Sequence, residues 1–174
     1  MSKTFLKNEN SKRSWPQVPK LYGWLYLNRR GKWLIKREQV KHLGMIKFLK
    51  ENYKKNTKGE WYIENGPQKA FVTLEYTPLI IRLSHNGSLT TNIDTEIETP
   101  NSITLDDEGN VLFESSIGLG LLDDRDMYQF SELVDEDIST VNKIYWKGLV
   151  LPVRHIPRSK IPAFYKFSQC KESC

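Results

Sequence analysis

The stretch Gly23-Trp24-Leu25-Tyr26-Leu27-Asn28-Arg29-Arg30-Gly31-Lys32-Trp33-Leu34-Ile35-Lys36 decides the expected fold. Two apolar runs, residues 23–27 and 32–36, flank a polar segment whose Gly31 can adopt a positive φ, which predicts a β-hairpin. A loop of two or four residues would give the hairpin two faces, one with Trp24, Tyr26, Trp33 and Ile35 and the other with Leu25, Leu27 and Leu34. Because both faces carry large apolar side chains, we expect both to be covered.

Periodicity predicts two helices in a chain that is otherwise rich in strands. Over residues 43–55, Met45, Leu49 and Tyr53 recur every four residues, which indicates an amphipathic helix whose other side is basic. Residues 124–134 predict the second helix, residues 85–88 and 106–110 predict hairpin turns, and residues 144–153 predict one last strand. No internal repeat is evident in the sequence. The expected fold class is α+β and β-rich, with mostly antiparallel hairpins in two packed sheets or small subdomains and two helices.

Composition along the chain divides it into four expected parts. Residues 1–19 predict a flexible basic arm, because they are polar, rich in lysine and poor in large apolar side chains. Residues 20–95 predict a subdomain of hairpin, helix and meander, and residues 96–156 a second β subdomain with one helix. Residues 157–174 are expected to form a C-terminal tail, part of which docks through its aromatic side chains.

The charges are sorted by region. Residues 1–60 carry 16 Lys and Arg against 4 Asp and Glu, residues 61–142 carry 3 against 16, and residues 143–174 carry 7 against 1. A basic beginning and end around an acidic middle indicate either an internal match of charges or surfaces that present opposite sign to a partner.

Several functional classes lack their sequence signals. No apolar run approaches the length of about 18 residues that a membrane span needs, and the first ten residues lack the apolar segment of a secretory signal. We therefore expect no membrane contact and a cytoplasmic location, which Cys170 and Cys174, the chain's two cysteines, also favour. The glycine-rich phosphate and dinucleotide motifs and the common zinc and serine hydrolase motifs are missing. We expect no cofactor, no metal and no catalytic residue.

The basic, aromatic beginning of the chain is the candidate site. A cationic surface beside exposed aromatic rings is typical of proteins that bind single-stranded nucleic acid. The candidate residues for binding nucleic acid or an anion are Arg29, Arg30, Lys32, Lys47, Lys50 and Lys54. In the alternative interpretation the tryptophans belong to the core and the lysines line a solvated helix face, and this is the commoner arrangement.

The other titratable groups have structural interpretations. The carboxylates at 106–108 and 123–126 lack the ligand spacing of a calcium loop, and a turn and a helix cap explain them. His42, His85 and His155 fall in separate elements, which favours surface or capping roles. The pair Cys170 and Cys174 lacks the two further ligands that zinc needs, so we expect an inert tail pair.

Several motifs together resemble an uncharacterised proteobacterial family of unknown function. They are Gly23-Trp24-Leu25-x-Leu27, Arg29-Arg30-Gly31-x-Trp33, Asn52-Tyr53, Gly59-x-Trp61, Asn65-Gly66-Pro67-Gln68 and Asp106-Asp107-Glu108-Gly109-Asn110. The resemblance covers about residues 20–135, and the order of helix and hairpins is also similar to that of a second uncharacterised bacterial family. It implies a β-rich α+β fold in a bacterial cytoplasm, and it carries no activity, cofactor or catalytic residue.

Three functional hypotheses follow. The first is a non-enzymatic interaction protein that binds a protein partner or a second copy of itself through its segregated basic and acidic surfaces. The second is a nucleic-acid-binding protein that uses the basic hairpin and helix. The third is a small-ligand pocket or an enzyme site between the two sheets, which the many aromatic residues suggest.

Overall fold

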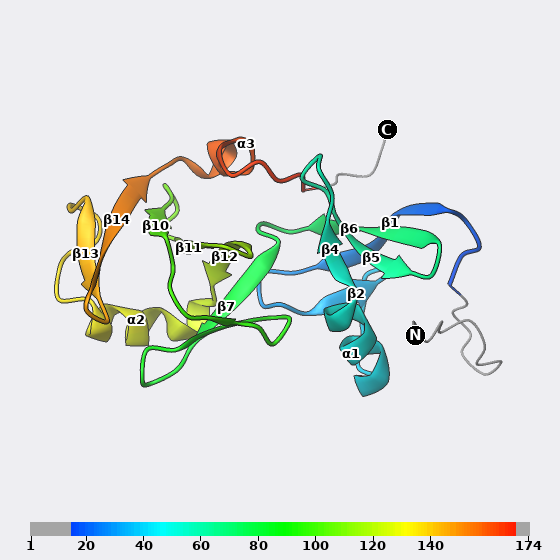
Figure 1. Ribbon diagram of the computed structural model, residues 1–174, viewed down its shortest axis with the longest axis horizontal. Coiled ribbons are helices and arrows are strands. Elements are labelled where there is room, and N and C mark those ends of the chain that lie inside the picture. Colours follow the sequence, from blue (N-terminus) through cyan, green and yellow to red (C-terminus); the bar gives the residue numbers. More distant parts are fainter. Residues whose placement is uncertain (1–14, 170–174) are drawn as a thin grey trace.

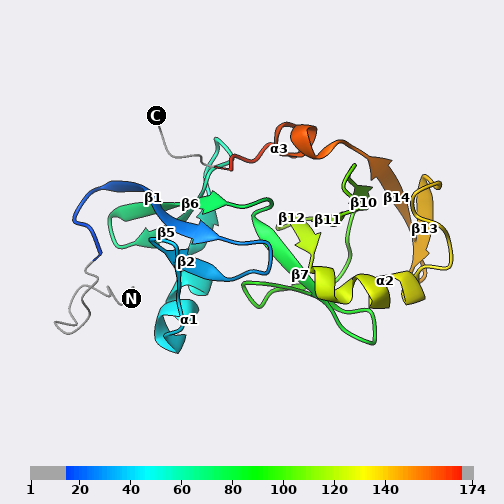
Figure 2. The ribbon, with the colours of Figure 1, turned by 180° about the vertical axis from the view of Figure 1, so that it is seen from behind.

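The computed structural model describes residues 15–169, and two β-sheets lie side by side along its long axis in both views (Figures 1 and 2). The first sheet has the order β3-β2-β1-β6-β5-β4. Its strands are β1 (Lys20–Leu27), β2 (Trp33–Ile35), β3 (Glu38–Gln39), β4 (Tyr53–Lys55), β5 (Trp61–Asn65) and β6 (Gln68–Leu74). Helix α1 (Leu43–Glu51) connects β3 to β4 and lies beneath this sheet in Figure 1.

The second sheet follows after the short linker 75–78 and has the order β13-β14-β10-β11-β12-β7-β8-β9. Its strands are β7 (Leu79–Leu83), β8 (Leu89–Thr91), β9 (Glu96–Ile97), β10 (Ser102–Leu105), β11 (Val111–Ser115), β12 (Gly118–Leu122), β13 (Lys143–Trp146) and β14 (Leu149–His155). A 3₁₀ turn (Asp124–Asp126) leads into helix α2 (Met127–Leu133), and a second 3₁₀ turn (Arg158–Lys160) leads into helix α3 (Ile161–Phe164).

The expectation of two helices and mostly antiparallel hairpins needs correction. Both sheets are mixed, because β1 pairs in parallel with β6, β7 with β12, and β10 with β14. Neighbouring strands in the sequence form antiparallel hairpins as expected, but the parallel pairs join strands that are far apart in the chain, and local sequence does not encode them. The third helix, α3, has four residues, which is too short for a periodic pattern.

The two sheets share one topology. The order β3-β2-β1-β6-β5-β4 recurs as β9-β8-β7-β12-β11-β10, to which β14 and β13 are added. The registers agree as well: the pairs Leu25↔Ile35 and Leu25↔Val72 of the first sheet have the counterparts Ile81↔Thr91 and Ile81↔Leu122 in the second. The chain therefore contains a structural repeat, β1–β6 and β7–β12, that the sequence did not reveal.

Five hairpins close through the same five-residue loop. In each loop the first N–H donates to the carbonyl of the fifth residue and the fourth N–H donates to the carbonyl of the first. The fourth position has a positive φ and holds Gly31, Gly59, Gly87, Asp94 or Gly109. The first position holds a side chain whose oxygen accepts a backbone N–H from within the loop: Asn28, Asn56, Ser84, Thr91 or Asp106. The turns expected at 85–88 and 106–110 are among them.

This loop length reverses the expected faces of the first hairpin. Leu27 pairs with Trp33, so the loop spans residues 28–32 and has an odd number of residues. A loop with an odd number of residues shifts the strand pairing by one residue. Every side chain of β2 therefore lies on the face of the sheet opposite to the expected one. Leu25, Leu27, Trp33 and Ile35 therefore share the buried face.

Two other elements differ from expectation. Helix α1 ends at Glu51 because Asn52 caps it, with both its backbone N–H and its side-chain amide donating to the carbonyl of Phe48. Lys54 therefore lies on β4 and not on the helix. The expected last strand is a hairpin, since Lys147 and Gly148 both take positive φ and turn the chain between β13 and β14.

The first apolar core spans the two sheets, because besides residues of the first sheet it includes five of the second, Leu79, Ile80, Leu112, Leu119 and Leu121. A second core belongs to the second sheet and helix α2. Trp15 packs against Trp24 in the first core, so the described end of the expected arm, residues 15–19, lies against the first sheet. Strands β7 and β8, which fall within the expected first subdomain 20–95, pair in the second sheet. The segment after β14 returns along the top of Figure 1 and places Phe167 in the first core. Residues 1–14, Cys170 and Cys174 lie outside the described residues.

Candidate functional site

The hairpin loop between β1 and β2 meets the second repeat at the junction of the two sheets. Gly31 in this loop lies against Ile80 and Asn92, so a Cβ atom at that position would come within 2.9 Å of the Asn92 side chain. The loop holds Arg29 and Arg30, two of the six candidate basic residues. The close approach of the glycine therefore brings both arginines to the beginning of α2 and the end of β12.

A pocket lies at this junction, and we call it the junction pocket. Its volume is about 410 Å³, which falls within the range of small-molecule sites. Its apolar lining consists of Leu121, Leu122 and Met127, and its polar lining consists of Asn28, Arg29, Arg30, Glu75, Asn110 and Asp124. The pocket thus combines an apolar wall with two guanidinium groups, two carboxylates and two amides.

Each arginine side chain of the junction pocket donates one hydrogen bond to another side chain. Arg30 Nη2 donates to Asp124 Oδ2 at 2.9 Å, and Arg29 Nη2 donates to Asn110 Oδ1. The backbone N–H of Arg29 donates to Glu75 Oε2 at 2.8 Å. Among the described residues these are the only side-chain hydrogen bonds of the two arginines, and each guanidinium has five N–H donors. Most donors of both guanidinium groups therefore make no hydrogen bond with the described residues.

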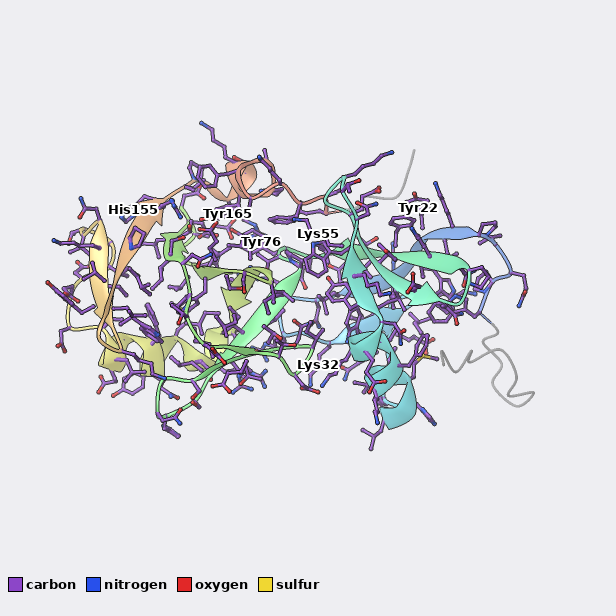
Figure 3. All side chains as sticks on the ribbon, in the orientation of Figure 1. Tyr22, Lys32, Lys55, Tyr76, His155 and Tyr165 are labelled. Carbon is purple, nitrogen blue, oxygen red and sulfur yellow. The ribbon has the colours of Figure 1, made fainter. Side chains whose placement is uncertain are left out.

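A buried tyrosine stands beside the pocket, near the middle of the molecule in Figure 3. Tyr76 Oη donates to Asp106 Oδ2 at 2.6 Å, and the guanidinium carbons of Arg29 and Arg158 lie 5.7 and 4.5 Å from its ring centroid. Burial, followed by the hydrogen bond to Asp106, raises the pKa of Tyr76 far above its usual value. The tyrosine therefore stays protonated and keeps Arg29 and the loop of Asn110 in place.

Asp106 is the acceptor of that network. Burial alone would raise its pKa, but hydrogen bonds from Tyr76, from Asn110 and from the backbone of Glu108 outweigh burial and lower the pKa. The carboxylate fixes the loop 106–110, which closes the polar side of the pocket.

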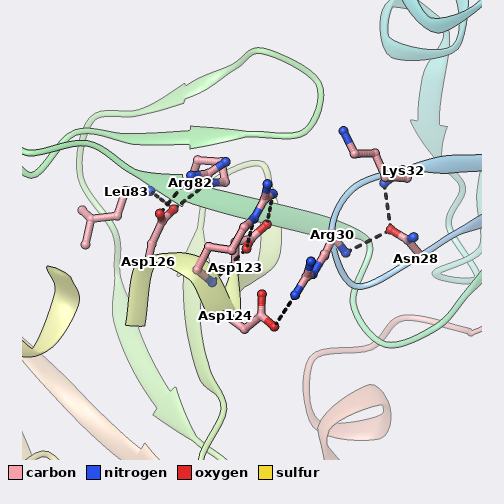
Figure 4. Close-up of polar contacts among 9 residues, drawn as sticks. Asn28, Arg30, Lys32, Arg82, Leu83, Asp123, Asp124 and Asp126 are labelled. Carbon is pink, nitrogen blue, oxygen red and sulfur yellow. Dashed lines mark hydrogen bonds and ion pairs between the residues drawn. The ribbon is translucent and has the colours of Figure 1, made fainter. Parts of the chain in front are cut away.

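The beginning of α2 is fixed by two further carboxylates, as Figure 4 shows. Asp126 accepts from Arg82 at 2.6 Å and from the backbone N–H of Leu83, and Asp123 accepts from Arg125. Burial acts to raise the pKa of Asp123, yet the hydrogen bonds and charge of Arg125 lower it to about 2. As expected, a helix start explains these acidic residues; the Asp123 side chain accepts the N–H of Arg125.

Two of the six candidate basic residues line the junction pocket. Figure 4 shows Arg30 extending to Asp124 while the Lys32 side chain points away. Lys47 and Lys50 lie on α1, where they pair with Glu51 and Asp94, and Lys54 pairs with Glu64 on the first sheet. The structure thus brings Arg29 and Arg30 together in the junction pocket and leaves the other four outside its lining.

The tryptophans of the first hairpin are in the core. Trp24 and Trp33 are 7% and 2% exposed, and Trp33 packs edge-on against Tyr53. This is the alternative arrangement that the sequence left open. Stacking of bases needs exposed rings, and these two rings are covered. Nucleic-acid binding through the basic hairpin and helix stays a prediction.

The basic ends of the chain meet the acidic middle within the molecule. Five ion pairs of the described residues join a basic residue of the ends to an acidic residue of the middle: Arg30–Asp124, Lys50–Asp94, Lys54–Glu64, Arg154–Glu114 and Arg158–Glu108. Some of the basic residues of the chain ends therefore pair with acidic residues of the middle of the same chain. Pairing of the same regions between two chains stays a prediction.

Two of the three histidines make hydrogen bonds with the backbone. His42 caps α1, because its Nδ1 accepts the N–H of Met45, and His155 lies within 3.1 Å of the carbonyl of Val141. Within residues 15–169, no group of three His, Cys, Asp or Glu side chains is arranged to hold a metal ion. In the same part of the chain, no helix has the length and apolar character to cross a membrane.

Comparison with known proteins gives the chain a family. A family model described as "Protein of unknown function (DUF2946)" matches residues 8–171. The chain belongs to this family. The expected membership of an uncharacterised family is confirmed, and no activity comes with it. A search of the curated proteins finds no match.

Two solved structures resemble this member of the family. A DUF1285 family protein from Silicibacter pomeroyi DSS-3 has a TM-score of 0.57 at 12% sequence identity, over 78% of this chain and 81% of the other. A DUF1285 family protein from Shewanella baltica OS155 has a TM-score of 0.49 at 19% identity, over 63% of this chain and 91% of the other. The first likeness shows a related fold and says nothing of function.

Sequence reasoning missed most of the junction pocket. Glu75, Asn110, Leu121 and Met127 belong to four different segments, and only the docking of the second repeat on the first hairpin brings them together. Two of the family motifs could have indicated the pocket from the sequence. They are Arg29-Arg30-Gly31 and the loop 106–110, and both contribute residues to its lining.

Proposed function

We propose that this protein binds a small polar ligand in the junction pocket, with an anionic group of the ligand held by Arg29 and Arg30. Binding is proposed because the lining combines two arginines with an apolar wall, and both are groups that recognise a ligand. This is the third of the hypotheses drawn from the sequence, in its non-enzymatic form. The single observation that supports it is the placement of two incompletely bonded arginines in a cavity with an apolar wall.

The ion pair at the mouth of the pocket does not oppose such binding. The side chains of Arg30 and Asp124 are 56% and 66% exposed, and exposed ion pairs contribute only about 0–1 kcal/mol. A carboxylate or phosphate can therefore take the place of Asp124 on Arg30 at small cost. The ligand group can also use the N–H donors of Arg30 that Asp124 does not engage.

The methionines give a direct test. Met127 lines the pocket, whereas Met45 lies on α1 of the first repeat. Protein labelled with ¹³C at the methionine methyl groups is titrated with 4-methylpentanoate and with phenyl phosphate. We expect a saturable shift of the Met127 signal and an unchanged Met45 signal. An unchanged Met127 signal with both probes, or equal shifts of both methionines, contradicts the proposal.

Two variants distinguish a specific contact of Arg30 with the ligand from a general effect of the positive charge of the hairpin. Arg30→Ala removes a pocket donor, and Lys32→Ala removes an exposed charge two residues away whose side chain points elsewhere. We expect Arg30→Ala to weaken binding of 4-methylpentanoate roughly tenfold, because the loss of a charge-assisted hydrogen bond is of that order. Lys32→Ala is expected to leave the affinity within about twofold, since screening by water and salt weakens distant charges. Equal effects of the two variants contradict a specific role for Arg30.

Interaction with a protein is a second candidate, and a different observation favours it. Residues 143–169 carry six basic residues and no acidic one. Within this segment Tyr145 and Val150 face each other across β13 and β14 and are 64% and 56% exposed. A basic surface with exposed apolar side chains suits an acidic partner or the acidic middle of a second copy. Sedimentation at low and high salt tests self-association, and a monomer under both conditions contradicts it.

A further inference from the structure

We propose that the ligand of the junction pocket is a zwitterion with an aliphatic side chain, of the chemical class of the α-amino acids. The inference rests on the proposed function, because it names the ligand class of the same pocket. It follows from the signs of the charges that line the pocket and from the apolar character of the remaining wall.

The charged lining is balanced. Arg29 and Arg30 supply two positive charges from the hairpin loop, while Glu75 in the linker and Asp124 before α2 supply two negative charges. A ligand that carries only negative charge gains the arginines but comes near both carboxylates, which repel it. A ligand that carries only positive charge meets the reverse arrangement. A ligand with one group of each sign gains from both sets.

Glu75 is placed to accept the ammonium group. Its Oε2 accepts the backbone N–H of Arg29 at 2.8 Å, which fixes the carboxylate at the base of the hairpin loop. Among the described residues this is the one hydrogen bond of the Glu75 carboxylate, and an ionised carboxylate has acceptor sites for several donors. The same loop therefore presents the arginine side chains and holds a carboxylate beside them.

The apolar wall accounts for the side chain of the ligand. Leu121 and Leu122 at the end of β12 and Met127 at the start of α2 form this wall. A flexible methionine adapts to aliphatic groups of different shape. An α-amino acid places its carboxylate and ammonium one carbon from the side chain, so polar and apolar contacts can be made together in a small cavity.

The other repeat supports the special character of this lining. The loop between β7 and β8 matches the loop between β1 and β2 in length, hydrogen bonds and register. It carries His85 and Asn86 where the first loop carries Arg29 and Arg30, and its Gly87 lies beside the side chain of Lys147. The charged array is thus a feature of the junction and not of the loop type.

Three probes of one shape test the inference. L-leucine has both charges, 4-methylpentanoate lacks the ammonium group, and 3-methylbutylamine lacks the carboxylate. Calorimetric titrations of the full chain are expected to give the tightest binding with leucine, by roughly tenfold over either analogue, because each analogue loses one charge-assisted contact.

The outcomes separate the inference from the function on which it rests. If 4-methylpentanoate binds as tightly as leucine or more tightly, the zwitterion is wrong and the arginine-based pocket stands. If the amine binds best, the zwitterion and the anionic role of the arginines are both wrong. If none of the three probes binds, the inference is overturned, and the phenyl phosphate titration then decides whether the pocket binds any anion.

A variant of Glu75 gives the second readout. Glu75→Gln keeps an oxygen acceptor for the N–H of Arg29, so the fold of the loop is preserved while the charge is lost. We expect this variant to weaken leucine roughly tenfold and to leave 4-methylpentanoate unchanged or tighter. Lys32→Ala is the matched control and should change neither affinity. An unaltered affinity of Glu75→Gln for leucine overturns the inference.

Discussion

Replacing Tyr76 by phenylalanine isolates one hydrogen bond at the junction of the two repeats. Tyr76 is 1% exposed, two guanidinium groups lie within 6 Å of its ring centroid, and its hydroxyl donates to Asp106 at 2.6 Å. Phenylalanine keeps the ring and its contacts with Arg29 and Arg158. The change therefore removes only the contact between the hydroxyl and the carboxylate.

The expected loss follows from the other partners of Asp106. Its carboxylate keeps three donors, which are the side chain of Asn110 at 2.8 Å and two backbone N–H groups at 2.9 Å. A hydrogen bond to a charged group contributes about 1.5–3 kcal/mol, and the remaining donors place this one at the lower end, about 1.5 kcal/mol. For a chain of this size the loss corresponds to a decrease in Tm of about 3–6 °C.

The loss should depend on pH. The hydrogen bond from Tyr76 lowers the pKa of Asp106 in the folded protein. The bond therefore stabilises the fold fully above the pKa of the unfolded chain, about 4, and this stabilisation disappears as the pH falls through the lower pKa of the folded protein. Urea unfolding at neutral and at acidic pH measures this, with Tyr145→Phe as the matched control on an exposed tyrosine. A loss no larger than in the control, or one that does not shrink with decreasing pH, refutes the reasoning.

Three further predictions concern stability. Gly59→Ala should destabilise more than Gly109→Ala: both glycines have positive φ, which costs about 1–2 kcal/mol for alanine, but only at Gly59 would a Cβ meet a backbone carbonyl, at 2.4 Å. Thermal unfolding of both variants compares them, and equal losses contradict the expectation. Arg125 outweighs burial and lowers the pKa of Asp123 to about 2. The ionised Asp123 therefore stabilises the fold fully above about pH 4, and this stabilisation is lost as the pH falls toward 2. In Asp123→Asn, the free energy of unfolding measured in an acid titration should depend less on pH over this range. Arg30→Ala should change the free energy of unfolding by less than about 1 kcal/mol, because its ion pair is exposed, and a larger loss in urea unfolding would mean that the arginine holds the junction.

The sequence predicted the local elements of the fold well. The first hairpin, β1 and β2, and the turns at 85–88 and 106–110 follow from runs of apolar residues punctuated by glycine and asparagine. The reason is physical: a hairpin is encoded by its own loop residues and by the alternation on its two strands. Helix α2 was also found, because its apolar residues recur at helical spacing.

The pairings between strands that are distant in the chain could not be predicted from the sequence. The parallel pairs of β1 with β6 and of β7 with β12 depend on which hairpins meet, and no local pattern encodes that. The repeat was missed because its two copies share turn geometry and register more than residue identity. Arg29 and Arg30 were found as candidates by charge, but the carboxylate and apolar walls that make them a pocket come from the second repeat.

The most direct test of the account is the position of a bound probe relative to Met127. Nuclear Overhauser contacts are measured between the methyl groups of 4-methylpentanoate and the methionine methyl groups of the protein. The account predicts contacts with Met127 and none with Met45, together with their loss in Arg30→Ala. Contacts with Met45 instead, or binding that persists unchanged without Arg30, would contradict the claim that the junction of the two repeats is the binding site.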